Sequence, residues 1–373
     1  MAIVTPPELH GLLAIAREEG LDMKPVLLRV LTDLYVAAPH HSQDEVVQFR
    51  EIAGQMIPHV DEATALIVAC KLAAYPHTPP ALAEALIARA DDAARITLGD
   101  AVWLPRPLTV EHAAHSDRLL AAAVAARSDL DGALMRLLLS RNEAVIDVTL
   151  AGNTALQLPH DVKDELLARG REEHAVAVAL LARSDLTGAD KAVLFPAADR
   201  DTRLQIIEDA IRLAHLSGRT RHQRHAPVDF VSALEAAAIN GSDSAFRAVL
   251  ALGLGCAVEK LGPVLDDRSG ETLAVVLAAV GVDDEMAARI FMFRDPLIGH
   301  STQRVFSLVE MMRRLPWAAA ERITASMLGL EGTPTRASGP RAPAEPLPPV
   351  QRPSPAAMAA PTPVSQPRRV GEP

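Results

Sequence analysis

Six apolar segments of the chain each begin just after an acidic residue, and these acidic residues recur at nearly regular intervals. The intervals between them are 30, 25, 26, 30 and 28 residues. The acidic residues are Glu62, Asp92, Asp117, Glu143, Glu173 and Asp201. Each segment shows the three- and four-residue spacing of a helix, as in "SDRLLAAAVAARS". A unit of this length holds two helices, so the pattern predicts a helical repeat.

The pentapeptide "ARSDL" occurs at 126–130 and again at 182–186, two repeats apart. It follows the apolar segment in both copies and precedes a second helical segment. We interpret it as the end of the first helix of a unit and the turn after it. Capping residues are expected to open the second helices, because their side chains accept hydrogen bonds from free amides. These residues are Thr78, Thr109, Asp131 and Thr187.

A two-helix unit of this size cannot bury its apolar face alone, so successive units must stack on one another. The composition agrees, because 49% of the residues are hydrophobic but only 3% are aromatic. Alanine, leucine and valine must then form the core, which favours closely packed helices over a sheet. The predicted fold is all-α: a HEAT-like α-solenoid of two-helix repeats over residues 62–214.

The chain outside the repeats divides into four predicted parts. They are an N-terminal helical cap (1–61), a basic linker (215–227), a less regular C-terminal helical lobe (228–332) and a disordered proline-rich tail (333–373). The lobe is expected to hold helices at 228–253, 256–264, 271–281, 283–293 and 302–328. The tail holds twelve of the 28 prolines, and its five Arg and two Glu give it a charge of +3. The rest of the chain therefore carries a net charge of −13, which together with the +3 of the tail gives the total of −10.

The sequence predicts a cytoplasmic protein with no membrane span. Its start, "MAIVTPPELHGLLAIAREEG", lacks a basic leader. The longest apolar stretches are much shorter than the ~20 residues that cross a bilayer. The two cysteines, Cys70 and Cys256, lie far apart in apolar runs, so buried free thiols are expected.

Segments such as "LLAAAVAARSDLDGALMRLLLSRNEAVI" and "VLDDRSGETLAVVLAAVGVDDEMAARIFMF" resemble a bacterial domain-of-unknown-function family with HEAT-like repeats. The resemblance covers roughly residues 8–328 and lies in the order of the segments, without an invariant motif. It implies a helical solenoid, mostly in cytoplasmic proteins of alphaproteobacterial type. It implies no catalytic residue, metal or cofactor.

The residues give no positive sign of catalysis. The chain has no phosphate-binding glycine loop, nucleophile elbow or Cys-x-x-Cys motif. It lacks the His-Glu dipeptides of di-iron hydroxylases with similar folds. His112 and His115 share a helix face, but no second cluster completes a metal site. A nucleic-acid enzyme of the HEAT-like DNA glycosylase kind stays an alternative, although the negative charge opposes it.

Two groups of arginines are candidate contacts for an anion or a partner. Arg219, Arg221 and Arg224 alternate with histidines, including His222, in a stretch without acidic residues. They suit phosphate or carboxylate groups, and the alternative is a solvated linker. Arg127 and Arg183 occupy the same position in two repeats, where they line a binding face or interact with helix-end carbonyl groups.

Three further features have a functional and a structural interpretation. The recurring carboxylates either form a ridge that recruits basic partners or simply complement helix dipoles. The tail segment "PRAPAEPLPP" is either a polyproline ligand or a plain linker. Sulfur and aromatic side chains form either an apolar ligand groove or the core of the C-terminal lobe; they are Phe291, Met292, Phe293, Phe306, Met311, Met312, Trp317 and Met327.

Taken together, the residues predict a non-enzymatic interaction scaffold or regulatory adaptor. Its partner is a protein or peptide held on the helical-repeat surface. The alternative function is a sensor that binds a small anionic ligand, such as a nucleotide, between the two helical lobes. Neither interpretation includes a cofactor or a metal.

Overall fold

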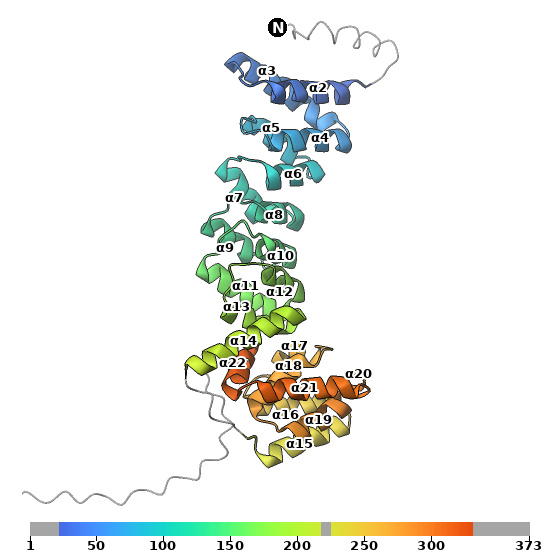
Figure 1. The fold of residues 1–373 in the computed structure, drawn as a ribbon. Coiled ribbons are helices and arrows are strands. Elements are labelled where there is room, and N and C mark those ends of the chain that lie inside the picture. The colour runs from blue at the N-terminus through green and yellow to red at the C-terminus, as the bar shows by residue number, and fades with distance from the viewer. Residues whose placement is uncertain (1–21, 218–224, 331–373) are drawn as a thin grey trace, which may run out of the picture. The chain divides into compact units, whose positions relative to one another are not determined.

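The computed structural model describes residues 22–217 and 225–330, and in these ranges every regular element is a helix (Figure 1). The prediction of an all-α fold is confirmed. Three predicted features lie outside the described residues: a first helix within 7–20, most of the basic linker, and the tail from 333.

The first thirteen helices cover residues 24–216. They are α2 (Lys24–Ala37), α3 (Gln43–Met56), α4 (Glu62–Ala73), α5 (Pro80–Ile87), α6 (Asp92–Asp100), α7 (Arg106–His115), α8 (Arg118–Ala125), α9 (Gly132–Ser140), α10 (Ala144–Gly152), α11 (His160–Glu172), α12 (His174–Leu181), α13 (Gly188–Val193) and α14 (Arg200–Leu216). Short 3-10 turns follow α3 (η1, Ile57–His59) and α13 (η2, Phe195–Ala197).

Helices α4 to α13 are arranged in two columns (Figure 1). In the even column, α4, α6, α8, α10 and α12 pack each against the next. In the odd column, α7, α9, α11 and α13 do the same. Apart from α5 and α13, each of these helices thus contacts a helix of the other column and a neighbouring helix of its own column, which lets neighbouring pairs bury a shared core.

Helix N-termini begin where the sequence supplies an acceptor. Asp61, Asp91 and Asp117 accept hydrogen bonds from amides in the first turns of α4, α6 and α8. Asp131 and Thr187 cap α9 and α13 as predicted. Ser42 and Glu45 form the capping box of α3.

Thr78 and Thr109 do not cap helices, which corrects the prediction for both. Helix α5 begins after Pro79, and Thr78 instead donates to the carbonyl oxygens of Leu72 and Tyr75. Helix α7 begins after Pro105, so Thr109 lies within its first turns and donates to Arg106 O. In both cases a nearby proline starts the helix, because its missing N–H removes the need for a cap.

Arginines at helix ends join successive repeats. Arg183, which follows α12, donates to Ala151 O, Asn153 O and Leu156 O at 3.3, 2.7 and 2.6 Å. Asp185 holds the same guanidinium through two bonds of 2.8 and 2.7 Å. The last carbonyl groups of a helix have no partner within it, so the next repeat supplies their donor. We call this arrangement an arginine clip.

The arginine clip recurs in both columns. Arg127 reaches Leu98 O at the end of α6, and Asp129 orients it. In the odd column, Arg89 with Asp91 contacts the end of η1, and Arg141 with Glu143 contacts the end of α7. After α10, Asn153 takes the role of the arginine and donates to Ala125 O and Arg127 O. At these four places, 89–91, 127–129, 141–143 and 183–185, the motif Arg-x-Asp/Glu lies at a joint between successive helix pairs.

The C-terminal lobe contains eight more helices. They are α15 (Val228–Ile239), α16 (Asp243–Leu254), α17 (Gly262–Leu265), α18 (Glu271–Val280), α19 (Asp284–Arg294), α20 (Pro296–Gly299), α21 (Thr302–Arg314) and α22 (Trp317–Leu328), with the 3-10 turn η4 at Val258–Leu261. Two predicted helices are each divided in two. The predicted helix 228–253 is divided into α15 and α16 near Gly241, whose φ is +63°. The predicted helix 302–328 is divided into α21 and α22 at Pro316, which precedes α22.

Three clusters of buried side chains form the core. The first joins α2 and α3 to α4–α6, and the second runs from Ala73 to Leu194. The third covers Ala192 to Leu328 and includes the buried side chains of α14. Helix α22 packs against α18 of the lobe and against α13 and α14, so the lobe and the repeats share a core there.

Across 22–217 and 225–330, no individual helix has the length and apolar character needed to traverse a bilayer. Helix α16 and the following η4–α17 segment reach that length and composition only as a pair bent by 105°.

Candidate functional site

Three adjacent helices of the even column expose a surface without charged side chains. Counted from the N-cap residues Asp117, Glu143 and Glu173, the positions two, five, six and nine residues on carry no charged side chain in α8, α10 and α12, and all but Ala122 are exposed or half-buried. The residues at these positions that are exposed or half-buried are Leu119, Ala123, Ala126, Val145, Val148, Thr149, Gly152, Ala175, Val178, Ala179 and Ala182. We call this set the uncharged face. The position one residue after each N-cap is also exposed and borders this surface with Arg118, Ala144 and His174.

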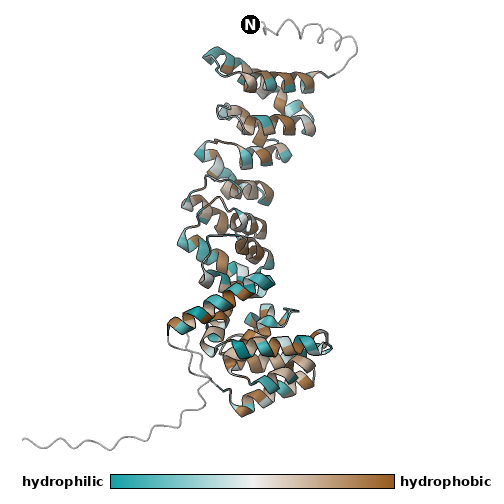
Figure 2. Ribbon diagram, in the orientation of Figure 1, coloured by the Kyte–Doolittle hydropathy of each residue, from teal (hydrophilic) through white to brown (hydrophobic). Residues whose placement is uncertain are grey.

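Three of the four larger aliphatic side chains of the uncharged face are well exposed, and the fourth, Val148, is half-buried. Leu119 is 48% exposed, Val145 40% and Val178 48%. The opposite sides of the same helices are buried in the repeat core, so α12 ("HAVAVALL") is apolar almost all round (Figure 2). A helix that is apolar all round is normally covered on every side. Here one side is open.

The uncharged face has defined ends. Helix α4 repeats its pattern with Ala63, Ile67 and Cys70, but α6 interrupts it with the exposed ion pair of Arg95 and Asp92. At the other end, the equivalent positions of α14 are Asp201, Leu204, Gln205 and Glu208. The surface is therefore confined to α8, α10 and α12.

The odd column has a different surface, because ion pairs connect its successive helices. Arg106 of α7 pairs with Asp131 at 2.5 Å, Arg136 of α9 with Asp161 at 2.5 Å, and Lys163 of α11 with Asp190 at 3.0 Å. We call these three pairs the ion-pair ladder. Both members of each pair come from this chain, so the odd column has charged groups already matched at its surface.

The ladder carboxylates have lowered pKa values. Hydrogen bonds from Arg106 and Arg136 lower the pKa of Asp131 and Asp161, respectively. Burial alone would raise the pKa of Asp190, but bonds from Lys163 and Thr187 outweigh it and lower the value. These carboxylates are accordingly held in the charged form.

Arg127 and Arg183, predicted as partner contacts, are instead buried clips. They are only 3% and 2% exposed, and their guanidinium groups are occupied by helix-end carbonyls and by Asp129 and Asp185. This corrects their assignment to a binding face in favour of the carbonyl-binding alternative. The hydrogen bonds from Arg183 also lower the pKa of Asp185. Arg219, Arg221, His222 and Arg224 lie outside the described residues.

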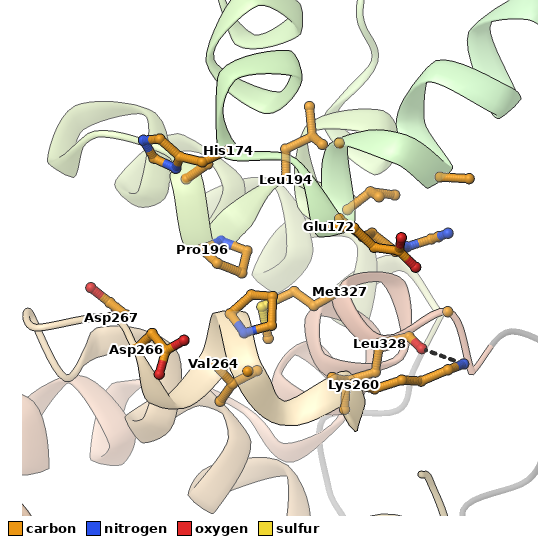
Figure 3. A pocket seen from close by; sticks show the side chains of 18 of the residues that line it. Glu172, His174, Leu194, Pro196, Lys260, Val264, Asp266, Asp267, Met327 and Leu328 are labelled. Atoms are coloured by element: carbon orange, nitrogen blue, oxygen red, sulfur yellow. Dashed lines mark hydrogen bonds between the residues drawn. The ribbon is translucent and has the colours of Figure 1, made fainter. Parts of the chain in front are cut away.

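A pocket of about 900 Å³ lies between the last repeats and the C-terminal lobe (Figure 3). One wall comes from the end of α11 and from α13 and η2, with Leu194 and Pro196. The other comes from η4, α17 and the end of α22, with Val264 and Met327. We call it the interlobe pocket.

Two cations of the interlobe pocket meet at the C-terminus of α22. Arg171 Nε donates to Ser326 O at 3.2 Å, and Lys260 Nζ donates to Leu328 O at 3.0 Å (Figure 3). Their positive charge complements the negative end of the helix dipole. Each keeps further N–H groups that these two bonds do not use.

Acidic groups also line the interlobe pocket, and Asp267 among them is fully engaged. It pairs with Arg203 at 3.0 Å and accepts hydrogen bonds from Ser269 and Thr272. Burial would raise the pKa of Asp267, but these bonds and Arg203 lower it. The lining contains no Phe, Tyr or Trp, so His174 supplies its one aromatic ring.

The remaining predicted groups are dispersed. Within the ranges described, no three His, Cys, Asp or Glu side chains gather as metal ligands would. His112 Nδ1 bonds Ser116 Oγ. Both cysteines are free, but Cys70 is exposed and Cys256 is only half-buried, which corrects the expectation of buried thiols.

The sulfur and aromatic set does not form one groove or one core. Phe291 is fully buried, whereas Phe293 and Phe306 are 54% and 68% exposed. Trp317 is half-buried and donates to Ala279 O. The set is therefore divided between the interior of the lobe and its surface.

Comparison with known proteins gave no match from family models, from curated protein sequences or from solved structures. The resemblance to a family with HEAT-like repeats stays a prediction.

Proposed function

We propose that this chain is a non-enzymatic interaction scaffold of the cytoplasm, a HEAT-like solenoid that holds a protein partner on the uncharged face. One observation carries the proposal: α8, α10 and α12 are apolar on both sides, yet their outer sides are open to solvent. Contiguous exposed apolar surface of this kind is typical of interaction sites. The adjacent odd column, with its matched ion pairs, has no such surface.

The test is a pull-down from native lysate with the full chain and a Val145→Lys/Val178→Lys variant. Both valines are exposed, so the variant should fold normally, and circular dichroism checks this. The matched control is Leu252→Lys/Phe306→Lys, which changes two exposed side chains of the C-terminal lobe (79% and 68% exposed). We expect a stoichiometric partner that the control retains and the face variant loses. Equal capture by all three proteins would contradict the proposal.

A second function is favoured by the interlobe pocket: a sensor for a small anionic ligand. Arg171 and Lys260 supply donors for a carboxylate or phosphate group, and the aliphatic walls suit an aliphatic body. Apart from His174 the lining has no aromatic ring, which favours such a ligand over a nucleotide.

Differential scanning fluorimetry with two ligand sets tests this function. Aliphatic carboxylates and phosphate monoesters form one set, and nucleotides form the other. We expect the first set to raise the melting temperature, and a Lys260→Ala variant to lose the increase. A stabilisation that survives Lys260→Ala and Arg171→Ala would locate the ligand elsewhere.

A further inference from the structure

We infer that the partner of the uncharged face is an amphipathic α-helix with basic residues along its flanks. This inference rests on the proposed function and names the chemistry of the partner. It follows from three properties of the face: its spacing, its small side chains and the charge at its edges.

The spacing of the face matches a helix laid across it. Equivalent positions recur on α8, α10 and α12, which pack side by side. Helices in contact lie roughly 8–10 Å apart, so the three axes span about 20 Å. At 1.5 Å per residue, a helix of about 13 residues reaches from the first axis to the third, and one of about 18 residues also covers the outer sides of α8 and α12.

Small side chains between the larger ones allow a close approach. Ala126, Gly152 and Ala182 occupy the same position, nine residues after the N-cap, on the three helices. Val178 lies one helical turn from this row, while Leu119 and Val145 lie two turns from it on their own helices. Grooves of this kind accept the side chains of a second helix, which anchors itself through residues three and four apart.

Carboxylates lie at both edges of the face. Asp117, Glu143 and Glu173 stand at the helix N-termini, while Asp129 (side chain 58% exposed) and Asp185 (47%) stand at the other ends. Glu143, Asp129 and Asp185 already pair with Arg141, Arg127 and Arg183 of this chain. Among the described residues Asp117 and Glu173 take part in no such pair, so they are the edge charges open to a partner. In these three helices Arg118 is the single exposed Lys or Arg. A partner with basic flanks gains from this arrangement, and an acidic one is repelled.

The same charges disfavour a second copy of this chain as the occupant. Two copies meeting through the uncharged face would bring acidic edges against acidic edges, and the chain outside the tail carries −13. Like charges across an interface weaken association. The occupant is therefore a different polypeptide.

Fluorescence anisotropy with the full chain and three labelled peptides tests the inference. Each peptide has about 18 residues, the length of a helix that crosses the face. The first has leucine and alanine on one side and lysine on the flanks. The second replaces lysine by glutamate, and the third is a shuffled lysine peptide without helical periodicity. We expect the first to bind at least about tenfold more tightly than either of the others.

Two variants connect the binding to the face and to its edges. Val145→Lys/Val178→Lys should weaken the lysine peptide by about tenfold or more. Asp117→Asn/Glu173→Gln removes two edge charges, and Asn still caps α8. This variant should bind the lysine peptide about threefold more weakly, and its affinity for the glutamate peptide should not fall. The control variant Leu252→Lys/Phe306→Lys should leave the affinities for both peptides unchanged.

Three outcomes would overturn the inference: no binding of the lysine peptide, equal binding of the glutamate or shuffled peptide, or binding that Val145→Lys/Val178→Lys does not alter. Analytical ultracentrifugation showing a dimer that this variant dissociates would assign the face to a second copy instead. If a partner is lost from the face variant in the pull-down but the peptides fail, the proposed function stands and the helix inference is wrong. If the pull-down shows no difference, the proposed function itself fails.

Discussion

The two columns of the repeat region meet water in different ways. In the odd column, the ion-pair ladder connects α7, α9, α11 and α13 through cations and carboxylates of this chain. In the even column, α8, α10 and α12 expose aliphatic side chains, and no such ladder of ion pairs connects these three helices. Exposed ion pairs add little stability, so the ladder serves mainly to complete a surface. The ion pairs of the odd column are thus made by this chain alone, whereas the proposed function assigns the apolar surface of the even column to a partner.

The largest expected effect on stability concerns the arginine clips, which both columns share. Arg183→Ala removes the donor of three carbonyl oxygens at a buried joint and the cation that pairs with the half-exposed Asp185. We expect the free energy of unfolding to fall by about 3 kcal/mol, measured by urea denaturation. Arg183→Lys should recover only part, because an ammonium group cannot replace the planar fork.

Arg136→Ala is the matched control, because it breaks an exposed pair of the ladder instead of a clip. Its urea midpoint should stay near that of the unchanged chain. Equal losses for Arg183→Ala and Arg136→Ala would erase the distinction between buried clips and surface pairs.

Acid should weaken the odd column through its ladder. The folded pKa values of Asp131, Asp161 and Asp190 lie below the ordinary 3.8. The folded state then binds fewer protons than the unfolded state, so the contribution is present above that pH and lost as pH falls through the folded values. Urea denaturation between pH 7 and 2.5 should show the loss, and a variant with all three changed to Asn should depend less on pH. An unchanged pH profile in that variant would mean that the ladder does not contribute.

The turns after the clips differ between the columns. Ala90, after α5, has φ of +57°, a left-handed conformation that costs a residue with a Cβ roughly 1 kcal/mol. Ala90→Gly should raise the free energy of unfolding by up to about 1 kcal/mol, measured by thermal and urea denaturation. Ser128, at the equivalent place after α8, has no positive φ. Ser128→Gly should therefore lower stability, and a gain there would contradict the explanation by strain.

The smallest effect on stability is expected on the uncharged face. Val145→Lys/Val178→Lys should change the free energy of unfolding by less than about 0.5 kcal/mol, because both sites are already exposed. The same variant should reduce the binding of an apolar dye to the native protein, measured by fluorescence. A large loss of stability would show that the valines support the repeat core and are not held free for a partner.

Helical periodicity and capping chemistry predicted the fold class and many helix starts. Asp131 and Thr187 are caps as expected, because a cap depends on residues a few positions apart. Helix breaks were harder to predict. The division at Gly241 depends on one residue with a left-handed backbone, and apolar spacing continues on both sides of it.

The candidate sites could be predicted only in part. The sequence of α12, "HAVAVALL", has no polar stripe. This agrees with an open apolar face, but a fully buried helix has the same pattern, so the sequence alone could not distinguish the two. The clips needed knowledge of which carbonyls lie opposite Arg127 and Arg183, some 27 to 32 residues earlier. The interlobe pocket combines Arg171, Lys260 and Met327, and no local pattern relates residues so far apart.

The arginine clip has a consequence for how such a chain can change over time. Its guanidinium binds main-chain oxygens of the preceding repeat, which are the same whatever side chains that repeat carries. A repeat can then drift in sequence without losing its joint, provided that its own Arg-x-Asp/Glu survives. A whole unit gained or lost by unequal recombination would meet a neighbour that it already fits, so the length of the array is open to change while the joints stay the same.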